Sequence, residues 1–231
     1  MLINSPRWIL IPARNEEQTI GDVIRAVRCV VDYPILVINS QSIDRTAEVA
    51  SQAGARVVDA PEQGYWQALR TGYHYLLQQT NCQEVVQLDA DGQHDPIHIP
   101  RFFDRLQQAE PLWVVGSRYR TGTPQESSLQ LGQTVLKSWM KIGFAIRYQD
   151  MSSGFWGLNR ATMEKFSTYT VPHDTADVAM RVFASRLDIC MVEFPTAMNP
   201  RYKGVSMHQG LWHRCRHLWQ VVHDVRSITT N

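Results

Sequence analysis

The segment EVVQLDADGQHDP, Glu84–Pro96, shows most directly how this chain folds and where its chemistry lies. Its run at 85–88 is typical of a buried strand, and the chain turns abruptly polar at Asp89. Pro96 is well placed to open a helix over 97–107. A strand therefore ends here, and a loop with two closely spaced carboxylates begins.

Two interpretations of Asp89 and Asp91 are open from spacing alone. Buried carboxylates are costly unless a cation neutralises them, and hard oxygen ligands with the Gln93 amide nearby suit Mg²⁺ or Mn²⁺. A metal ion held in this way would keep open coordination positions, and these could bind a diphosphate. The alternative is that both residues only shape a turn and cap a helix, as Asp residues in loops commonly do. Asp-x-Asp is too weak a motif to decide between them.

Composition indicates a globular protein and argues against several classes. The chain has 231 residues with 44% hydrophobic content, enough for one large domain or two small ones. Its formal net charge of +1 gives no electrostatic case for a nucleic-acid partner. No stretch reaches the ~18 apolar residues of a membrane span, and the N-terminus lacks a signal-peptide pattern, so we expect a cytoplasmic protein. The scattered cysteines show no zinc spacing and are expected to be reduced.

Strands alternate with helices along the chain. Short apolar runs predict strands at 8–11, where Pro12 is expected to stop the strand, and at 35–38, 55–58, 85–88, 112–115, 155–158 and 189–195. Helical spacing of apolar residues predicts helices at 19–31, 44–53, 64–79, 97–107, 129–146 and 176–185. This rhythm predicts an α/β fold with a mostly parallel sheet, whose polar loops gather at the carboxyl ends of the strands.

An ordered series of motifs resembles a known family. IPARNEEQTI is followed by VINSQSIDRT, GYWQALRTG, LDADGQHDP, VVGSRY, DMSSGFWGLNR and RYKGVS. The series resembles family 2 glycosyltransferases, and most nearly the dolichyl- or polyprenyl-phosphate mannosyl- and glucosyltransferases. An ordered series is far more specific than one Asp-x-Asp. The resemblance implies a Rossmann-like GT-A fold with helices on both faces of the sheet, a divalent metal, and inversion of the sugar's anomeric configuration.

The resemblance also implies a domain organisation. It covers a single GT-A domain at 1–210, with a nucleotide-sugar half at 1–117 and an acceptor half at 118–210. The segment 211–231 follows as an amphipathic helix, with Trp219, Val222 and Val225 on its apolar stripe. Such a helix either lies on a membrane surface or covers its own domain.

On the donor side, the resemblance assigns roles residue by residue. Metal and diphosphate binding falls to Asp89, Asp91 and Gln93, all with oxygen donors. The loop that cradles base and ribose contains Pro12, Arg14 and Glu16, and the late phosphate-binding loop contains Arg201.

On the acceptor side, the residues of interest are one arginine and two carboxylates. Arg118 suits a phosphate oxygen, although pairing with a structural carboxylate would need no ligand. If the acceptor is an alcohol, it must lose a proton, and Asp177 is our first choice for the base, with Asp150 second. A phosphate acceptor arrives ionised and needs no strong base.

The chain departs from the family pattern near the donor. Asn39 and Ser40 stand where two adjacent Asp residues are usual, Gln41 replaces a Gly, and Tyr65-Trp66 replaces a Lys-Gly pair. These changes leave open an altered nucleotide preference, an altered pocket shape or a weakened donor site. Base stacking and packing at the start of a helix explain the two aromatics equally well.

The sequence therefore predicts a metal-dependent, inverting glycosyltransferase. It would move a hexose from a UDP- or GDP-linked donor to a phosphate or hydroxyl acceptor, with a lipid-linked polyprenyl phosphate among the options. One alternative is a sugar nucleotidyltransferase, which should show a Gly- and Arg/Lys-rich triphosphate loop that PARNEEQT lacks. The other is a non-catalytic binding protein on the same scaffold, which the donor-side departures motivate.

Overall fold

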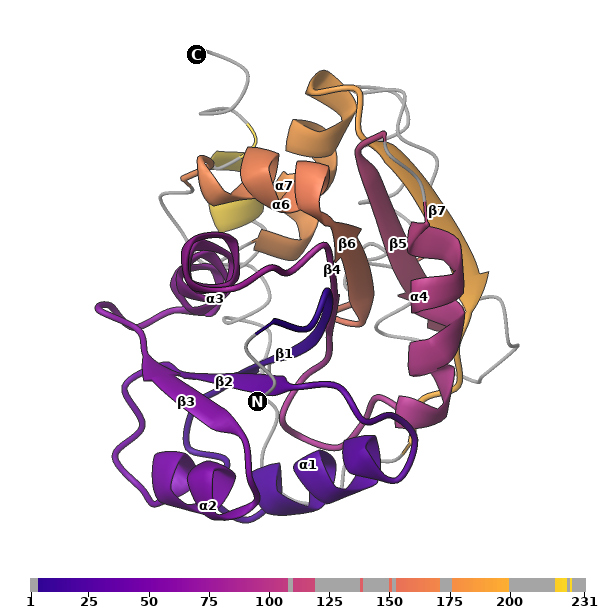
Figure 1. Cartoon of the computed structure of the whole chain (residues 1–231). Coiled ribbons are helices and arrows are strands. Elements are labelled where there is room, and N and C mark those ends of the chain that lie inside the picture. Colours follow the sequence, from indigo (N-terminus) through magenta and orange to yellow (C-terminus); the bar gives the residue numbers. More distant parts are fainter. Residues whose placement is uncertain are drawn as a thin grey trace.

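A central sheet with helices on both faces forms the body of the molecule (Figure 1). The computed structural model describes residues 4–107, 110–118, 138, 150, 153–170, 176–199, 219–223 and 225. Within these ranges the sheet has seven strands in the order β3-β2-β1-β4-β6-β5-β7. The predicted α/β class is confirmed.

The N-terminal half of the sheet is entirely parallel. Its strands are β1 (Arg7–Ala13), β2 (Ile35–Asn39), β3 (Arg56–Asp59) and β4 (Glu84–Gln87). The helices that connect them are α1 (Ile20–Arg28), α2 (Thr46–Gln52) and α3 (Tyr65–Gln79). Because β1 pairs with both β2 and β4, the chain order reverses beside β1, which is where open α/β sheets bind ligands.

Pro12 does not end the first strand, so that prediction is wrong. β1 runs on to Ala13, and Pro12 stands in register with Ile38 of β2. Proline is tolerated in a sheet only where its missing N–H would have no partner. Leu10, two residues earlier and so facing the same side, marks the end of pairing with β4. The backbone nitrogen of Pro12, which carries no hydrogen, therefore points to the side where β4 no longer pairs with β1.

The C-terminal half of the sheet introduces one reversed strand. β5 (Leu112–Ser117) and β7 (Cys190–Pro195) are parallel to each other, and β6 (Trp156–Asn159) runs antiparallel to both β4 and β5. The helices here are η1 (Pro96–His98), α4 (Ile99–Leu106), α6 (Arg160–Ser167) and α7 (Ala176–Arg186). The sequence did not predict α6, which the Asn159 side chain caps by accepting from the Thr162 N–H. The expected helix at 129–146 lies outside the described residues, apart from position 138.

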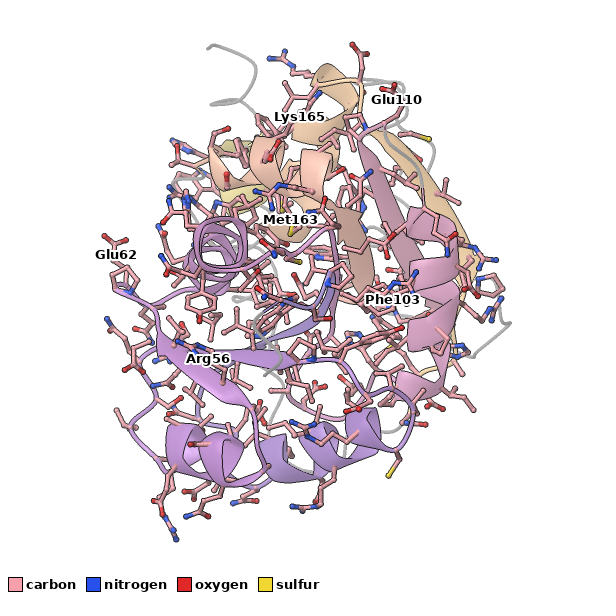
Figure 2. The ribbon with its side chains drawn as sticks, viewed as in Figure 1. Arg56, Glu62, Phe103, Glu110, Met163 and Lys165 are labelled. Atoms are coloured by element: carbon pink, nitrogen blue, oxygen red, sulfur yellow. The ribbon has the colours of Figure 1, made fainter. Side chains whose placement is uncertain are left out.

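Alternation along the strands divides the core between the two faces. Trp8 and Leu10 of β1 pack with α3, α6 and α7, whereas Ile9 and Ile11 pack with α1, α2 and α4. Figure 2 labels one residue of each cluster, Met163 on the first face and Phe103 on the second, among the side chains of the whole chain. Helices therefore shield both faces of the central strands from water, which explains why these strands are continuous apolar runs in the sequence.

Only a short piece of the C-terminal segment is described. Val221 and Val225 are buried against the α3–α6–α7 cluster, whereas Trp219 is 61% exposed and does not share their face. This differs from the expected stripe, which included Trp219. In the part of the chain that the structure describes, no helix is long and apolar enough to cross a membrane. Contact of this segment with a membrane surface stays a prediction.

Candidate functional site

Loops after neighbouring strands meet at the carboxyl edge of the sheet. The N–H of Asn15, after β1, donates to Oγ of Ser42, after β2, at 3.0 Å. The N–H of Gly64, just before α3, donates to Oγ of Ser40 at 3.1 Å. The hydroxyl of Tyr65 then reaches Asp89, after β4. The predicted gathering of polar loops at this edge is confirmed.

Asp89 lies at the centre of this edge. Its Oδ1 accepts from the Tyr65 hydroxyl at 3.1 Å, and its side chain keeps 35% of its accessible surface. Gly154 backs it so closely that a methyl group there would lie 2.6 Å from Oδ2. Burial raises the pKa of Asp89, His94 opposes the shift, and the charge of Asp91 adds to it. The charge of Asp91 therefore disfavours the ionised form of Asp89.

His94 supports Asp89 from inside the loop. It is 6% exposed and stacks on Phe155 with ring centroids 5.0 Å apart. Its Nδ1 accepts from the backbone N–H of Asp89 at 3.1 Å, so the proton of the neutral ring is on Nε2. That nitrogen lies 3.8 Å from Oδ2 of Asp89. His94 thus contacts both the backbone and the carboxylate of one residue.

Asp91 and Gln93 follow Asp89 in the same loop. Asp91 is 7% exposed, and its Oδ1 accepts from the N–H of Gln93 at 3.0 Å. The chain after β7 returns here, since the N–H of Asn199 donates to the carbonyl of Gln93 at 2.8 Å. The loop is thus held from both halves of the sheet.

The donor set at Asp89 and Asp91 fits a divalent metal that is shared with a substrate. Carboxylate oxygens are the ligands that Mg²⁺ and Mn²⁺ prefer, and a cation would relieve the repulsion between these two. Among the residues that the structure describes, no group of three or more His, Cys, Asp or Glu could hold a metal by itself. Mg²⁺ commonly uses one or two carboxylates and takes its other ligands from phosphate and water.

Arg118, which directly follows β5, pairs with Asp150. Its Nε and Nη2 donate to the two carboxylate oxygens at 2.7 and 2.6 Å. Asp150 is fully buried, and its backbone is held as well, by Arg181 at the carbonyl and by Glu193 at the N–H. Burial alone would raise the pKa of Asp150, but the hydrogen bonds and charge of Arg118 outweigh it and lower the pKa.

This geometry matches the structural alternative for Arg118. Both oxygens of Asp150 are engaged, and a carboxylate with a lowered pKa is a weak base. The role of Asp150 as second-choice base therefore receives no support from its surroundings. Neither residue's part in the reaction is tested by the structure.

The loop after β1 contains the residues expected to cradle the base and ribose. Arg14 is exposed and contacts the side-chain amide of Gln63. Glu16 is held at both ends: its N–H donates to Thr46 Oγ1 at 2.7 Å, and its Oε2 accepts from Thr19 at 2.7 Å. The ring of Pro12 is buried. Nucleotide binding by these residues stays a prediction.

The residues after β2 are bound within the protein itself. Asn39 donates from Nδ2 to Oδ1 of Asp59 at 2.7 Å, and Ser40 Oγ bonds Gly64. Gln41 takes the left-handed conformation, with φ 54°, that a glycine adopts without cost. Its amide donates to the carbonyl of Pro61 at 2.9 Å, which helps to hold it there.

Several predicted site residues lie outside what the structure describes. Arg201 belongs to the undescribed range 200–218. The backbone of Asp177 lies in the first turn of α7, but its side chain is not described. Their assigned roles as phosphate ligand and catalytic base stay predictions.

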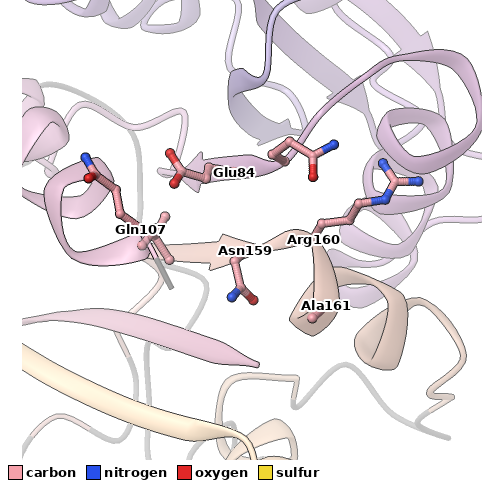
Figure 3. A pocket seen from close by; sticks show the side chains of 7 residues that line it. Glu84, Gln107, Asn159, Arg160 and Ala161 are labelled. Atoms are coloured by element: carbon pink, nitrogen blue, oxygen red, sulfur yellow. The ribbon is translucent and has the colours of Figure 1, made fainter. Parts of the chain in front are cut away.

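A separate hollow of about 330 Å³ lies at the other end of the central strands (Figure 3). Glu84, at the start of β4, and Asn159, at the end of β6, both line it. Glu84 is paired with Arg7 at 2.9 Å, and Arg160 donates to the Cys82 carbonyl at 3.0 Å. Because Asp89 follows the opposite end of β4, this hollow is not part of the candidate site.

Sequence reasoning missed three residues that hold Asp89. Tyr65 was interpreted as a packing or base-stacking aromatic, and His94 and Gly154 were given no role. A usable signal was Gln87, a polar residue inside an otherwise apolar strand, because a buried amide needs partners. It is fully buried, and Tyr65 is one of those partners.

Comparison with known proteins identifies the family of this chain. The model for glycosyl transferase family 2 matches residues 8–166, so the chain belongs to glycosyl transferase family 2. The resemblance carried by the motifs is confirmed.

Two relatives align with most of this chain. It is 28% identical over 200 residues to glycosyltransferase AglJ of Haloferax volcanii, covering 85% of this chain and 64% of that protein. It is 23% identical over 229 residues to the dolichol-phosphate mannosyltransferase of Pyrococcus furiosus, covering 93% and 63%. The chain thus spans less than two thirds of the length of these curated relatives.

A solved structure shows the same fold. Glucosyl-3-phosphoglycerate synthase from Mycobacterium tuberculosis, in complex with Mn²⁺, UDP-glucose and phosphoglyceric acid, superposes with a TM-score of 0.70. The alignment covers 96% of this chain and 79% of that one, at 21% identity. The likeness confirms the GT-A fold.

Proposed function

We propose that the protein is a metal-dependent, inverting glycosyltransferase that moves a hexose from a nucleoside-diphosphate sugar to a phosphate or hydroxyl acceptor. The observation that carries the proposal is the placement of Asp89 and Asp91 directly after β4. There, at the edge beside the reversal in strand order, one carboxylate is nearly buried and the other is a third exposed.

Asp89, Asp91 and Gln93 would hold Mg²⁺ or Mn²⁺ together with the diphosphate of the donor. When bound, the metal would act as a Lewis acid that offsets the charge developing on the departing nucleoside diphosphate. Tyr65 and His94 keep the Asp89 carboxylate in place. The Mn²⁺ and UDP-glucose in the complex of the mycobacterial synthase support this assignment.

On the acceptor side, Asp150 would act by holding Arg118 at the end of β5. The bidentate pair fixes the guanidinium plane, and the side chain of Arg118 keeps 21% of its accessible surface. The accessible part of this side chain would then face a phosphate oxygen of donor or acceptor. For a hydroxyl acceptor, Asp177 would take the proton; for a phosphate acceptor, no base is needed.

Lipid-linked phosphate is one acceptor that fits this chemistry. The relative from Pyrococcus furiosus is named for dolichol phosphate, and the mycobacterial synthase was solved with phosphoglyceric acid. Both names describe an acceptor that carries an ionised phosphate. We assign the donor-binding site to residues 1–117 and the acceptor-binding site to residues 118–210, as the resemblance implies.

The test is sugar transfer or hydrolysis from UDP-glucose and GDP-mannose, with Mn²⁺ and with a chelator. We expect metal-dependent release of nucleoside diphosphate, abolished by Asp91→Ala in a protein that still folds. Glu48→Gln, an exposed change on α2, is the matched control and should keep full activity. No turnover of any donor, with metal binding intact, would favour the scaffold alternative. Release of pyrophosphate from a nucleoside triphosphate and a sugar phosphate would favour the nucleotidyltransferase.

A further inference from the structure

Four side chains form a directed chain of hydrogen bonds that ends on Asp89. Trp156 Nε1 donates to Oε1 of Gln87 at 2.7 Å, and Gln87 Nε2 lies 3.0 Å from the Tyr65 hydroxyl. An indole N–H can only donate, so Oε1 of Gln87 must face Trp156 and its NH₂ must face Tyr65. The phenol therefore accepts from Gln87 and donates its own proton to Oδ1 of Asp89.

This chain is rigid because its members stand on different packed elements. Gln87 lies on β4 with no exposed surface, Trp156 lies on β6, and Tyr65 opens α3. Tyr73 of α3 also donates to Oε1 of Gln87, at 3.1 Å, so the amide oxygen is fully engaged. The amide cannot turn over without breaking these bonds.

Steric contact completes the restraint on Asp89. A methyl group on Gly154 would lie 2.8 Å from the Tyr65 hydroxyl oxygen as well as 2.6 Å from Oδ2 of Asp89. The carboxylate is thus confined between the phenol, the bare backbone of Gly154 and the His94 ring. Its orientation is set before any ligand arrives.

We propose that Tyr65 is a positioning residue for the metal-binding carboxylate of Asp89, held in its donor direction by the buried Gln87. The inference rests on the proposed function, because it requires Asp89 to be a metal ligand. Mutation of a residue that orients a metal-binding side chain typically lowers the metal affinity by roughly 10- to 100-fold. Because the phenol is a neutral donor, it orients the Asp89 carboxylate without cancelling the negative charge that would bind the metal.

The test is Mn²⁺ binding to the whole chain, followed by the electron paramagnetic resonance signal of free Mn²⁺, with and without UDP or GDP. Tyr65→Phe removes only the hydroxyl and should weaken Mn²⁺ binding by roughly 10-fold or more. Tyr73→Phe is the matched control: it removes a buried hydroxyl bonded to the same Gln87, while the shorter bond from Trp156 still fixes the direction of the amide. Its Mn²⁺ affinity should stay within about twofold of the unmodified chain.

The outcomes separate this inference from the proposed function. If Tyr65→Phe binds Mn²⁺ as the unmodified chain does, while Asp91→Asn does not, the positioning role is overturned and the metal site stands. Equal losses in the two phenylalanine variants would also overturn it, because the effect would then be one of packing. If Asp91→Asn binds Mn²⁺ normally, the metal site itself fails.

Discussion

Asn39 and Asp59 are hydrogen-bonded across the ends of β2 and β3, with Nδ2 of Asn39 donating to Oδ1 of Asp59 at 2.7 Å. The other end of the Asn39 amide accepts from the N–H of Ser42 at 3.2 Å. A site that must donate to a carboxylate and accept from a backbone N–H suits an amide. Asp59, on the next strand, and the Ser42 N–H therefore explain why an amide suits position 39.

Asn39→Asp should destabilise the fold by about 1 to 3 kcal/mol, because it replaces a hydrogen bond with two facing carboxylates. Urea unfolding at neutral pH measures this loss. Asn39→Asp combined with Asp59→Asn exchanges donor and acceptor across the same gap and should recover most of it. Simple addition of the two single losses in the double variant would contradict the assigned pairing.

Arg118→Met should cost about 3 to 5 kcal/mol of unfolding free energy, because it leaves the carboxylate of Asp150 buried without its cation. Asp150 has no exposed surface, so water cannot replace the lost donors. Arg118→Met with Asp150→Asn removes the orphaned charge and should restore part of the stability. A loss below about 1 kcal/mol in the single variant would mean that the pair behaves as a surface pair.

The same pair predicts a dependence on pH. The pKa of Asp150 is lowered in the folded protein, so its contribution to stability is fully present above the ordinary unfolded value. That contribution is lost as the pH falls through the lowered, folded pKa. As the pH falls below about 4, the unmodified chain should therefore lose more stability than the Arg118→Met/Asp150→Asn variant does. Denaturation curves at several acidic pH values measure the difference, and equal slopes would contradict it.

Gly154→Ala should weaken Mn²⁺ binding, because its methyl group would enter the space of the Asp89 carboxylate. Gly157→Ala is the matched control: its methyl group would meet the core side chains of Leu106, at 2.9 Å, and Phe102 in place of a carboxylate. Both should lose about 1 to 3 kcal/mol of stability through overpacking. Only Gly154→Ala should also lose metal-dependent nucleotide binding, measured by thermal shift with Mn²⁺ and UDP or GDP. An identical ligand response in both variants would contradict the placement of Asp89.

Cys82 should resist thiol reagents in the native protein. It has no exposed surface, and burial raises its pKa to about 12. Cys29 and Cys190 are exposed. Mass spectrometry of protein labelled near pH 8 should find Cys29 and Cys190 modified, with Cys82 modified only after unfolding. Rapid native labelling of Cys82 would show that β4 opens readily.

Local sequence patterns determined the strands, most of the described helices, though not α6, and the place of the two acidic residues. An apolar run that becomes polar at Asp89 marks the end of a strand, because the apolar pattern and the tendency to form a turn depend on residues that are neighbours in the chain. The order of the motifs then indicated the family. These features involve residues a few positions apart, so they could be predicted without knowledge of the sheet.

Only the tertiary structure decided which polar side chains meet. Arg118 found Asp150, Asn39 found Asp59, and Tyr65 found Asp89, in each case across 20 or more positions. Pro12 could remain in β1 only because β4 stops short of it. Such pairings depend on the order and register of the strands, which bring distant residues to within 3 Å or so of each other. A linear pattern does not contain that register, so the partners of buried polar groups appear only once the sheet has formed.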